Sequence, residues 1–332
     1  MTDTLRTNWA ILGPGAISRD FLAGLRASRF GRLHAVGSSD PGRAAAFAAD
    51  AGAAVSGDYD AVLARDDVDA VYIGTVHTTH ADLAIRALEA GKAVLCEKPA
   101  SPDVSDVERI LAAAERADRP FVEAFKNRFG PWADALRSEL RDGELGRPLS
   151  VEAAFGFDAP TRSGRLFDPA LAGGAILDVG CYAVSLAVEA GFARDADPVI
   201  SLLEADGEVV SGVDGAATAT VRVGEVTSRV ATAVVRDLSS SAVIRCERGV
   251  IELPDAWGER DVSSAAIVLR PDGGAAMSIE VPTVQPMGAE ADAVSLAVAE
   301  GRREAAEMPW AHTRAIARIV TEWRASVLGS VG

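Results

Sequence analysis

The sequence predicts an α/β protein with two domains of different architecture: a doubly wound parallel sheet, then an α+β domain with a large, mostly antiparallel open sheet. The chain has 332 residues, and at about 150 residues per domain this length predicts two domains. In the first third, short apolar segments alternate with alanine-rich helical segments. After about residue 125, one apolar segment follows another across polar turns. We therefore place the domains at 1–124 and 125–332.

In the first domain, strands and helices are expected to alternate. The short apolar segments predict buried strands at 9–12, 33–36, 69–73, 93–96 and 120–125. The segments between them predict helices at 16–28, 44–51, 79–90 and 102–117. This alternation is typical of right-handed βαβ units, which build a parallel sheet that is covered on both faces.

The second domain is expected to be rich in strands. Its strands are predicted at 149–157, 199–205, 216–223, 227–236, 242–246, 250–253, 267–269 and 277–281. Turn residues at 222–225 and 271–274 predict hairpins, which join antiparallel strands. Helices are predicted at 131–141, 173–190, 288–301 and 310–328.

Composition and charge exclude several classes of protein. Lys and Arg number 33 against 48 Asp and Glu, a net charge of −15, whereas nucleic-acid binding needs clustered basic residues. No segment approaches the roughly 20 apolar residues of a membrane span, and the polar N-terminus does not resemble a signal peptide. The three cysteines are far apart in the sequence. We therefore expect no disulfide framework, no membrane partner and a cytoplasmic location.

Glycines follow the first predicted strand. Gly13 and Gly15 precede the first predicted helix, where they let the backbone turn tightly and approach a pyrophosphate at the helix N-terminus. Ser18 stands where the third glycine of the GxGxxG pattern is usual. The position at the first strand-to-helix turn predicts a Rossmann dinucleotide-binding domain; an ordinary tight turn is the alternative.

The end of the second predicted strand bears on the choice of cofactor. Many dinucleotide-binding proteins place a carboxylate there for the ribose 2′-hydroxyl, but this chain has Ser38. Ser39 is a further hydrogen-bond donor, and Arg43 at the next helix start can reach a 2′-phosphate. These residues favour NADP(H). In the alternative, Arg43 is solvated and Asp40 either caps the helix or binds the ribose of NAD(H).

Lys98 lies between Glu97 and Pro99, directly after the fourth predicted strand. Doubly wound sheets bind their ligands at the carboxyl ends of the strands. A lysine beside a carboxylate at that edge is suited to orienting a substrate hydroxyl and to joining a proton relay. The alternative is an ordinary solvated lysine.

A second group of chemical residues lies within 173–182, which reads GGAILDVGCY. On a helix, Asp178 and Tyr182 are four residues apart and therefore share a face. A tyrosine hydroxyl beside a lysine is suited to general acid–base work on a carbonyl/alcohol couple. In the alternative, Tyr182 is a packing residue and Asp178 a local cap.

Other residues are weaker candidates. Arg165, Phe157 and Trp257, and also Arg162, are placed in the second domain as candidates to line a substrate pocket. His77 and His80 are three residues apart, but they lack an acidic or cysteine partner nearby in the sequence. We therefore expect no metal site.

Together these motifs resemble the glucose–fructose oxidoreductase/inositol dehydrogenase (GFO/IDH/MocA) family. The resemblance rests on GPGAIS at 13–18, EKP at 97–99 and GGAILDVGCY at 173–182, with support from 75–80, 125–129 and 143–147. Many members have His where Tyr182 stands. The tyrosine form is similar to the branch with dihydrodiol dehydrogenases and NADP-dependent D-xylose dehydrogenases.

The resemblance implies a role for each candidate. It makes Lys98 the catalytic lysine, Tyr182 the proton donor or acceptor, and Asp178 a residue that orients substrate hydroxyls. Ser39 departs from the family pattern, since NADP-preferring relatives often have Arg there. The cofactor would be bound by Gly13, Gly15, Ala16 and Ile17 at the pyrophosphate, by Thr75, His77 and His80 at the nicotinamide side, and by Glu97 and Lys98 at its ribose and ring.

The sequence therefore predicts an NAD(P)-dependent oxidoreductase. It would transfer a hydride between nicotinamide C4 and a carbinol or carbonyl carbon of a sugar, polyol or cyclic diol. A non-catalytic NAD(P)-binding sensor on the same fold is the alternative, because fold does not fix function. A homodimer or homotetramer is expected, because self-association would cover the outer face of the second sheet.

Overall fold

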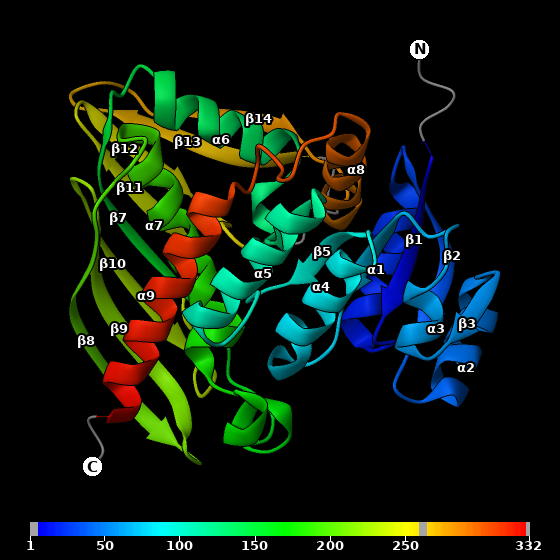
Figure 1. Ribbon diagram of the computed structural model, residues 1–332. Coiled ribbons are helices and arrows are strands. Elements are labelled where there is room, and N and C mark those ends of the chain that lie inside the picture. Colours follow the sequence, from blue (N-terminus) through cyan, green and yellow to red (C-terminus); the bar gives the residue numbers. More distant parts are fainter. Residues whose placement is uncertain (1–5, 259–263, 330–332) are drawn as a thin grey trace. The chain divides into compact units, whose positions relative to one another are not determined.

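The chain divides into two units, each built around its own sheet (Figure 1). The computed structural model describes residues 6–258 and 264–329. The first unit comprises the described residues up to Ser101 together with Ser105–Gly130 and Val284–Thr313. The second unit comprises Pro102–Val104, Pro131–Thr283 and the described residues from Arg314 onward.

The first unit contains a six-stranded parallel sheet of order β3-β2-β1-β4-β5-β6. This order is that of a doubly wound nucleotide-binding sheet, whose ligands bind where the order reverses, between β1 and β4. The predicted parallel sheet is thus confirmed. Its strands are β1 (Thr7–Leu12), β2 (Gly31–Gly37), β3 (Val55–Gly57), β4 (Ala70–Ile73), β5 (Ala93–Glu97) and β6 (Phe121–Ala124).

Helices cover this sheet. Phe21 of α1 stacks on Tyr72 of β4 with ring centroids 3.8 Å apart, which places α1 on the Tyr72 face. The segment 52–68, to which the sequence pattern assigned no element, forms β3 and α3, and Asp58 caps α3 by accepting from the Ala61 N–H at 2.7 Å. The helices are α1 (Ala16–Ala27), α2 (Pro41–Ala51), α3 (Tyr59–Leu63), α4 (His80–Glu89), α5 (Val104–Ala117) and α8 (Pro286–Ala299), with short η1 (His77–Thr79) and η2 (Lys126–Arg128).

The structure corrects the predicted domain boundary. Residues 284–313, which the sequence pattern placed in the second domain, return to the first unit. The reason is a close contact between α1 and α8: a Cβ on Gly24 would lie 2.6 Å from Met287, and one on Gly288 would lie 2.7 Å from the Gly24 carbonyl oxygen. Glycines on both helices therefore allow their backbones to touch.

The second unit contains an eight-stranded sheet of order β14-β13-β12-β11-β7-β10-β9-β8. Its pairs are antiparallel except for β7 and β10, which run parallel. The expected mostly antiparallel sheet is confirmed. Its strands are β7 (Pro148–Gly156), β8 (Ile200–Val210), β9 (Val213–Val223), β10 (Val226–Ala233), β11 (Ala242–Cys246), β12 (Gly249–Leu253), β13 (Ser264–Pro271) and β14 (Met277–Pro282).

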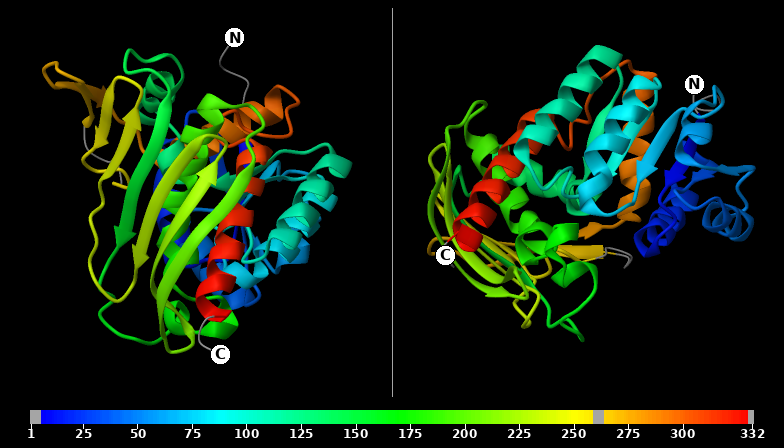
Figure 2. Two further views of the ribbon diagram at one scale, coloured as in Figure 1. Left: turned by 90° about the vertical axis from the view of Figure 1, so that its left-hand side faces the viewer. Right: turned by 60° about the horizontal axis from the view of Figure 1, so that its bottom comes forward.

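Helices pack on one face of this sheet. Figure 2 shows the curved sheet holding α7 (Cys181–Arg194) and the C-terminal part of α9 (Trp310–Gly329) on its concave side. The stretch Pro169–Arg194 has the length and mean hydropathy, 1.7, of a membrane span, but 89% of its apolar window is buried in the protein. It is thus a core segment of the second unit. The remaining helical elements are α6 (Pro131–Asp142), η3 (Arg165–Phe167), η4 (Pro169–Leu171) and η5 (Ile176–Gly180).

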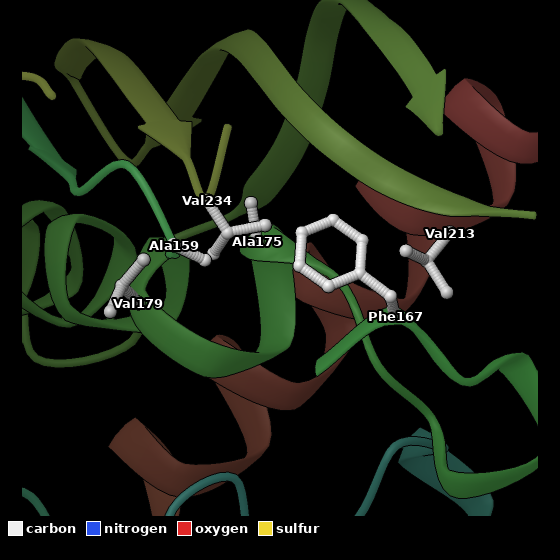
Figure 3. Packing of buried hydrophobic residues seen from close by; sticks show 6 residues of the cluster. All are labelled: Ala159, Phe167, Ala175, Val179, Val213 and Val234. Carbon is white, nitrogen blue, oxygen red and sulfur yellow. The ribbon is translucent and has the colours of Figure 1, made fainter. Parts of the chain in front are cut away.

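A small hydrophobic cluster lies around the start of η5 (Figure 3). In this view the Phe167 ring lies between Ala175 and Val213. Burying one phenylalanine side chain stabilises a fold by about 1.5–3 kcal/mol, so the cluster fixes the chain just before the residues predicted to be catalytic. Its members are Ala159, Phe167, Ala175, Val179, Val213 and Val234.

Candidate active site

The glycine turn follows β1. Gly13 has φ +89°, and a Cβ there would lie 2.5 Å from Thr75 Cγ2, so only glycine fits. The Gly15 N–H donates to the Gly13 carbonyl at 2.9 Å, and Gly15 directly precedes α1. The nearest atom to a Cβ on Gly15 would be the Gly74 carbonyl oxygen, 3.8 Å away. The turn is partly exposed, so its residues fit a dinucleotide pyrophosphate at the N-terminus of α1.

Ser18 replaces the third glycine of the pattern without widening the turn. Its hydroxyl donates to the Gly13 carbonyl at 2.6 Å. The space for the Ser18 hydroxyl is left by Gly74, which directly follows β4. A Cβ on Gly74 would lie 2.4 Å from Ser18 Oγ. The glycine that normally permits close packing of helix and strand thus stands on the partner segment.

The residues after β2 are held by hydrogen bonds to the backbone around them. The Asp40 carboxylate caps α2, accepting from the Gly42 and Arg43 N–H groups at 2.8 and 3.2 Å. Ser38 is buried and accepts from the Asp40 N–H at 3.2 Å, while Ser39 is exposed. The Arg43 guanidinium donates to the Pro14 carbonyl at 3.4 Å, which brings it beside the glycine turn.

The loop after β4 holds Thr75 and the two histidines. Thr75 is half-buried, and its hydroxyl accepts from Thr79 Oγ1 at 2.8 Å. His80 is fully buried, with its ring nitrogens 2.9 Å from the Pro99 carbonyl and 3.3 Å from the Thr75 carbonyl. His80 thus joins the loops after β4 and β5, and its place at the nicotinamide side stays a prediction. The buried His77 ring lies 5.7 Å from it.

Metal binding was not expected. Within 6–258 and 264–329, no three His, Cys, Asp or Glu side chains gather in a way that suits a metal ion.

Lys98 follows β5 at the carboxyl edge of the sheet, and Glu97 before it is buried. The Tyr72 hydroxyl donates to Glu97 Oε1 at 2.7 Å. Burial raises the pKa of Glu97, while the charge of Lys98 and the Tyr72 hydrogen bond oppose the shift. Burial, together with the charge of Glu97, raises the pKa of Tyr72 well above its ordinary value.

Glu123 of β6 is a second buried carboxyl near Lys98, which the sequence pattern did not single out. It pairs in register with Cys96, so it lies on the sheet face opposite to Glu97. Its Oε1 accepts from the Ala100 N–H at 2.8 Å. Burial raises the pKa of Glu123 to about 7, and the positive charge of Lys98 is among the influences that lower it. Two carboxyls thus flank the Lys98 segment.

Glu290 of α8 adds a third carboxyl. It is fully buried, and neither of its oxygens has a hydrogen-bond partner among the described residues. Burial, reinforced by the charge of Glu97, raises its pKa well above the ordinary value, and Lys126 opposes the shift. No sequence signal pointed to Glu290, because a glutamate in a helix is usually solvated.

In the second unit, Asp178 lies on η5 and Tyr182 on α7. The predicted continuous α-helix is incorrect here, since Ile176–Gly180 is a π-helical turn, a rare geometry that is frequent at functional sites. Arg165 donates to the Asp178 carboxylate at 2.9 Å. The structure thus brings together a residue predicted to bind substrate and one predicted to be catalytic.

Tyr182 belongs to an aromatic group. Its ring centroid lies 5.6 Å from that of Phe155 and 6.0 Å from that of Trp257, and only 6% of Tyr182 is exposed. The Trp257 indole N–H donates to the Ala154 carbonyl at 2.7 Å, which fixes its ring. Phe155 was missed, although alternation along its strand places it two residues from the predicted Phe157.

Phe157 and Arg162 both contact other residues of the second unit. Phe157 is half-buried and packs against the cluster around Phe167, and its place in a substrate pocket stays a prediction. Arg162 binds the Asp158 carboxylate and the carbonyls of Ala159 and Val235.

Two family models match the chain. The oxidoreductase family with an NAD-binding Rossmann fold matches residues 7–125. The GFO/IDH/MocA C-terminal domain matches residues 134–252. The two matches fall on the parallel sheet with the glycine turn and on the part of the chain that carries Asp178 and Tyr182.

Curated relatives include dehydrogenases. Trans-1,2-dihydrobenzene-1,2-diol dehydrogenase of Macaca fascicularis is 30% identical over 96% of both chains. The Homo sapiens enzyme of that name is 33% identical over 74% of this chain and 73% of its own. D-xylose 1-dehydrogenase (NADP(+)) 2 of Haloferax volcanii is 38% identical over 54% of this chain and 55% of its own.

Solved structures share the fold. An aldose-aldose oxidoreductase from Caulobacter crescentus matches with a TM-score of 0.85 at 23% identity, over 98% of both chains. A 3-ketoreductase from Actinomadura kijaniata, in complex with NADP and TDP-benzene, matches with a TM-score of 0.84 at 24% identity, over 97% of this chain and 98% of its own.

Proposed function

Because the chain belongs to the GFO/IDH/MocA family of oxidoreductases, we propose that it transfers a hydride between nicotinamide C4 and a carbinol or carbonyl carbon of a sugar, polyol or cyclic diol. The named activities of its relatives, on a dihydrodiol and on D-xylose, support this substrate class. The observation that carries the proposal is Lys98 at the carboxyl edge of the parallel sheet, flanked by the buried carboxyls of Glu97 and Glu123.

The first unit binds the cofactor in this proposal. When bound, the nicotinamide supplies or accepts the hydride. Gly13 and Gly15 leave room for the pyrophosphate at the start of α1. NADP(H) is the favoured form, because Arg43 lies beside the glycine turn and Ser38, not a carboxylate, stands directly after β2.

Lys98 and Tyr182 move the proton of the substrate hydroxyl. The charge of Lys98 opposes the rise that burial causes in the pKa of Glu97, and the Lys98 ammonium can donate a hydrogen bond to a substrate oxygen. Tyr182 is held by its aromatic neighbours and acts as the proton donor or acceptor. Asp178, whose orientation Arg165 fixes, accepts from substrate hydroxyls.

A panel of polyols, aldoses and cyclic diols, assayed with NAD and with NADP, tests the proposal. On a substrate found in this way, Lys98→Ala and Tyr182→Phe are each expected to lower kcat by about 100- to 10,000-fold, the usual contribution of general acid–base catalysis. Tyr59→Phe on α3 is the matched control and should keep the activity.

Full turnover by the Lys98→Ala variant would overturn this mechanism. Tight NADP(H) binding with no oxidation or reduction of the nicotinamide across the whole panel would favour a non-catalytic sensor instead.

We also propose that a second copy of this chain covers the outer face of the eight-stranded sheet. That face contains a hollow of about 660 Å³, with small and apolar side chains such as Ala154, Ala231 and Val243 among its lining. Arg229 and Glu152 lie side by side there. A surface that carries positive and negative side chains beside small apolar ones suits a two-fold contact, in which one patch must complement itself.

A further inference from the structure

We propose that Asp214 is a positioning residue for the reaction. It holds the start of the π-helical turn that carries Asp178 and leads into Tyr182, and Arg324 of α9 forms an ion pair with Asp214. This inference rests on the proposed function, because it takes Asp178 and Tyr182 as the reacting side chains. Asp214 lies on β9, about 30 residues after Tyr182, and nothing in the local sequence pattern links the two.

The contact is made at the first backbone amide of the turn. Asp214 is fully buried, and its Oδ2 accepts from the Ile176 N–H at 2.6 Å. Gly174, at φ +116°, leaves the room: a Cβ there would lie 2.2 Å from Asp214 Oδ1. The glycine that opens the motif is therefore needed for the approach of the carboxylate.

The start of a π-helical turn needs hydrogen-bond partners from outside the helix. Its first N–H groups have no acceptor inside the helix, and a carboxylate at a helix N-terminus is stabilised by the helix dipole. A second tether comes from β10, where the Thr232 hydroxyl donates to the Ala175 carbonyl at 3.1 Å. Residues from two strands thus fix the beginning of the turn, and the direction of Asp178 and Tyr182 follows from it.

Arg324 completes the arrangement. Its Nε lies 3.8 Å from Asp214 Oδ1. Arg324 is also the charged side chain that acts on the pKa of Asp214. Burial raises the pKa of Asp214 to about 6, whereas the Ile176 amide and Arg324 oppose the shift. The charge that holds the turn therefore changes within the range of ordinary assays.

Three variants of the full chain test the inference. Asp214→Asn keeps an oxygen for the Ile176 amide but has no charge, and Asp214→Ala has neither. Asp58→Ala is the matched control, because Asp58 also caps a helix, α3 of the first unit. Hydrogen exchange of 174–182 is measured together with kcat, KM and the pH dependence of kcat on the substrate found with the panel.

We expect Asp214→Ala to speed exchange in 174–182 and to lower kcat by about 10- to 100-fold, the effect of displacing reacting groups by about 1 Å. The KM for the cofactor should not change. Asp214→Asn should give a kcat between those of the wild-type protein and Asp214→Ala, and it should lack the fall in kcat below about pH 6 that we expect of the wild-type protein. Asp58→Ala should leave the exchange of 174–182 and kcat as they are.

Unchanged exchange in both Asp214 variants overturns the inference. Unchanged kcat in Asp214→Ala, with Tyr182→Phe inactive, overturns it while the proposed function stands. Unchanged kcat in both Asp214→Ala and Tyr182→Phe overturns the role of Tyr182 and the inference with it. If Asp214→Ala does not fold, Asp214→Asn decides, because a wild-type pH profile in this variant would contradict the inference.

Discussion

At the residue scale, buried carboxyls set the electrostatics around Lys98. Glu97, Glu123 and Glu290 are all buried, and each has a raised pKa whose largest cause is burial. Removing a carboxylate from water is costly unless charges or hydrogen bonds replace the solvent. These three carboxyls therefore lower the stability of the fold when they are ionised.

Glu123→Gln is expected to weaken the pH dependence of stability. The native carboxyl titrates at about 7, whereas the ordinary value is 4.5. The native state thus keeps its proton where the unfolded state has lost it, so stability falls as the pH rises from about 4.5 to about 7. The loss amounts to about 3 kcal/mol.

The free energy of unfolding at about pH 5 and about pH 8 measures this effect. Between these values the Gln variant should lose less stability than the wild-type protein, since its amide does not titrate but can still accept from the Ala100 N–H. Glu89→Gln, on the exposed end of α4, should behave like the wild-type protein. The same loss in the Glu123→Gln variant would contradict the assignment.

At the element scale, the turn between β1 and α1 depends on glycine for two separate reasons. Gly13 needs a positive φ, which costs other residues roughly 1–2 kcal/mol. It also needs the absence of a Cβ, because Thr75 occupies that space. Gly52, after α2, shares only the first requirement, with φ +77° and no atom within 4 Å of a Cβ.

Gly13→Ala and Gly52→Ala separate the two effects. Both variants should lose a similar amount of stability from the positive φ. Gly13→Ala alone should weaken NADP(H) binding, by about tenfold or more, because a displaced turn loses at least about 1.4 kcal/mol of contacts with the pyrophosphate. Fluorescence titration with NADPH measures the Kd. Equal Kd values for the two variants would show that the turn does not hold the cofactor.

At the scale of the whole molecule, the proposed association through the outer sheet face predicts a dimer or tetramer. Ala231→Arg should fill the hollow with a charged side chain and shift the particle to a monomer. Ala45→Arg, on the exposed side of α2, is the control and should leave the mass unchanged. Light scattering at micromolar concentration gives the mass. A monomeric wild-type protein, or an Ala231→Arg variant of unchanged mass, would contradict the proposal.

Local pattern predicted much of this protein. Strand and helix periodicity located both sheets, and the glycines after β1 marked a dinucleotide turn that the structure describes at the start of α1. Lys98 was found because it directly follows a strand. These features depend on a few neighbouring residues, so their signal is contained in the sequence itself.

The local sequence pattern could not predict contacts between segments that are far apart in the sequence. Glu290 returns on α8 to the face of β5, and Glu123 reaches the Ala100 amide from β6. In sequence, each is a glutamate like any solvated one. The start of η5 also contacts a distant residue, since the Ile176 N–H donates to Asp214 of β9.

The sequence by itself thus determined the two sheets, the cofactor turn and the identity of the candidate reacting residues. Only the tertiary structure showed which helices belong to which unit and which carboxyl groups are buried away from solvent. It also showed which side chains contact Asp178 and the segment that leads into Tyr182. The physical reason is that periodicity records which face of an element is buried. The pKa of a group and the direction of a side chain depend on whatever the fold packs against them.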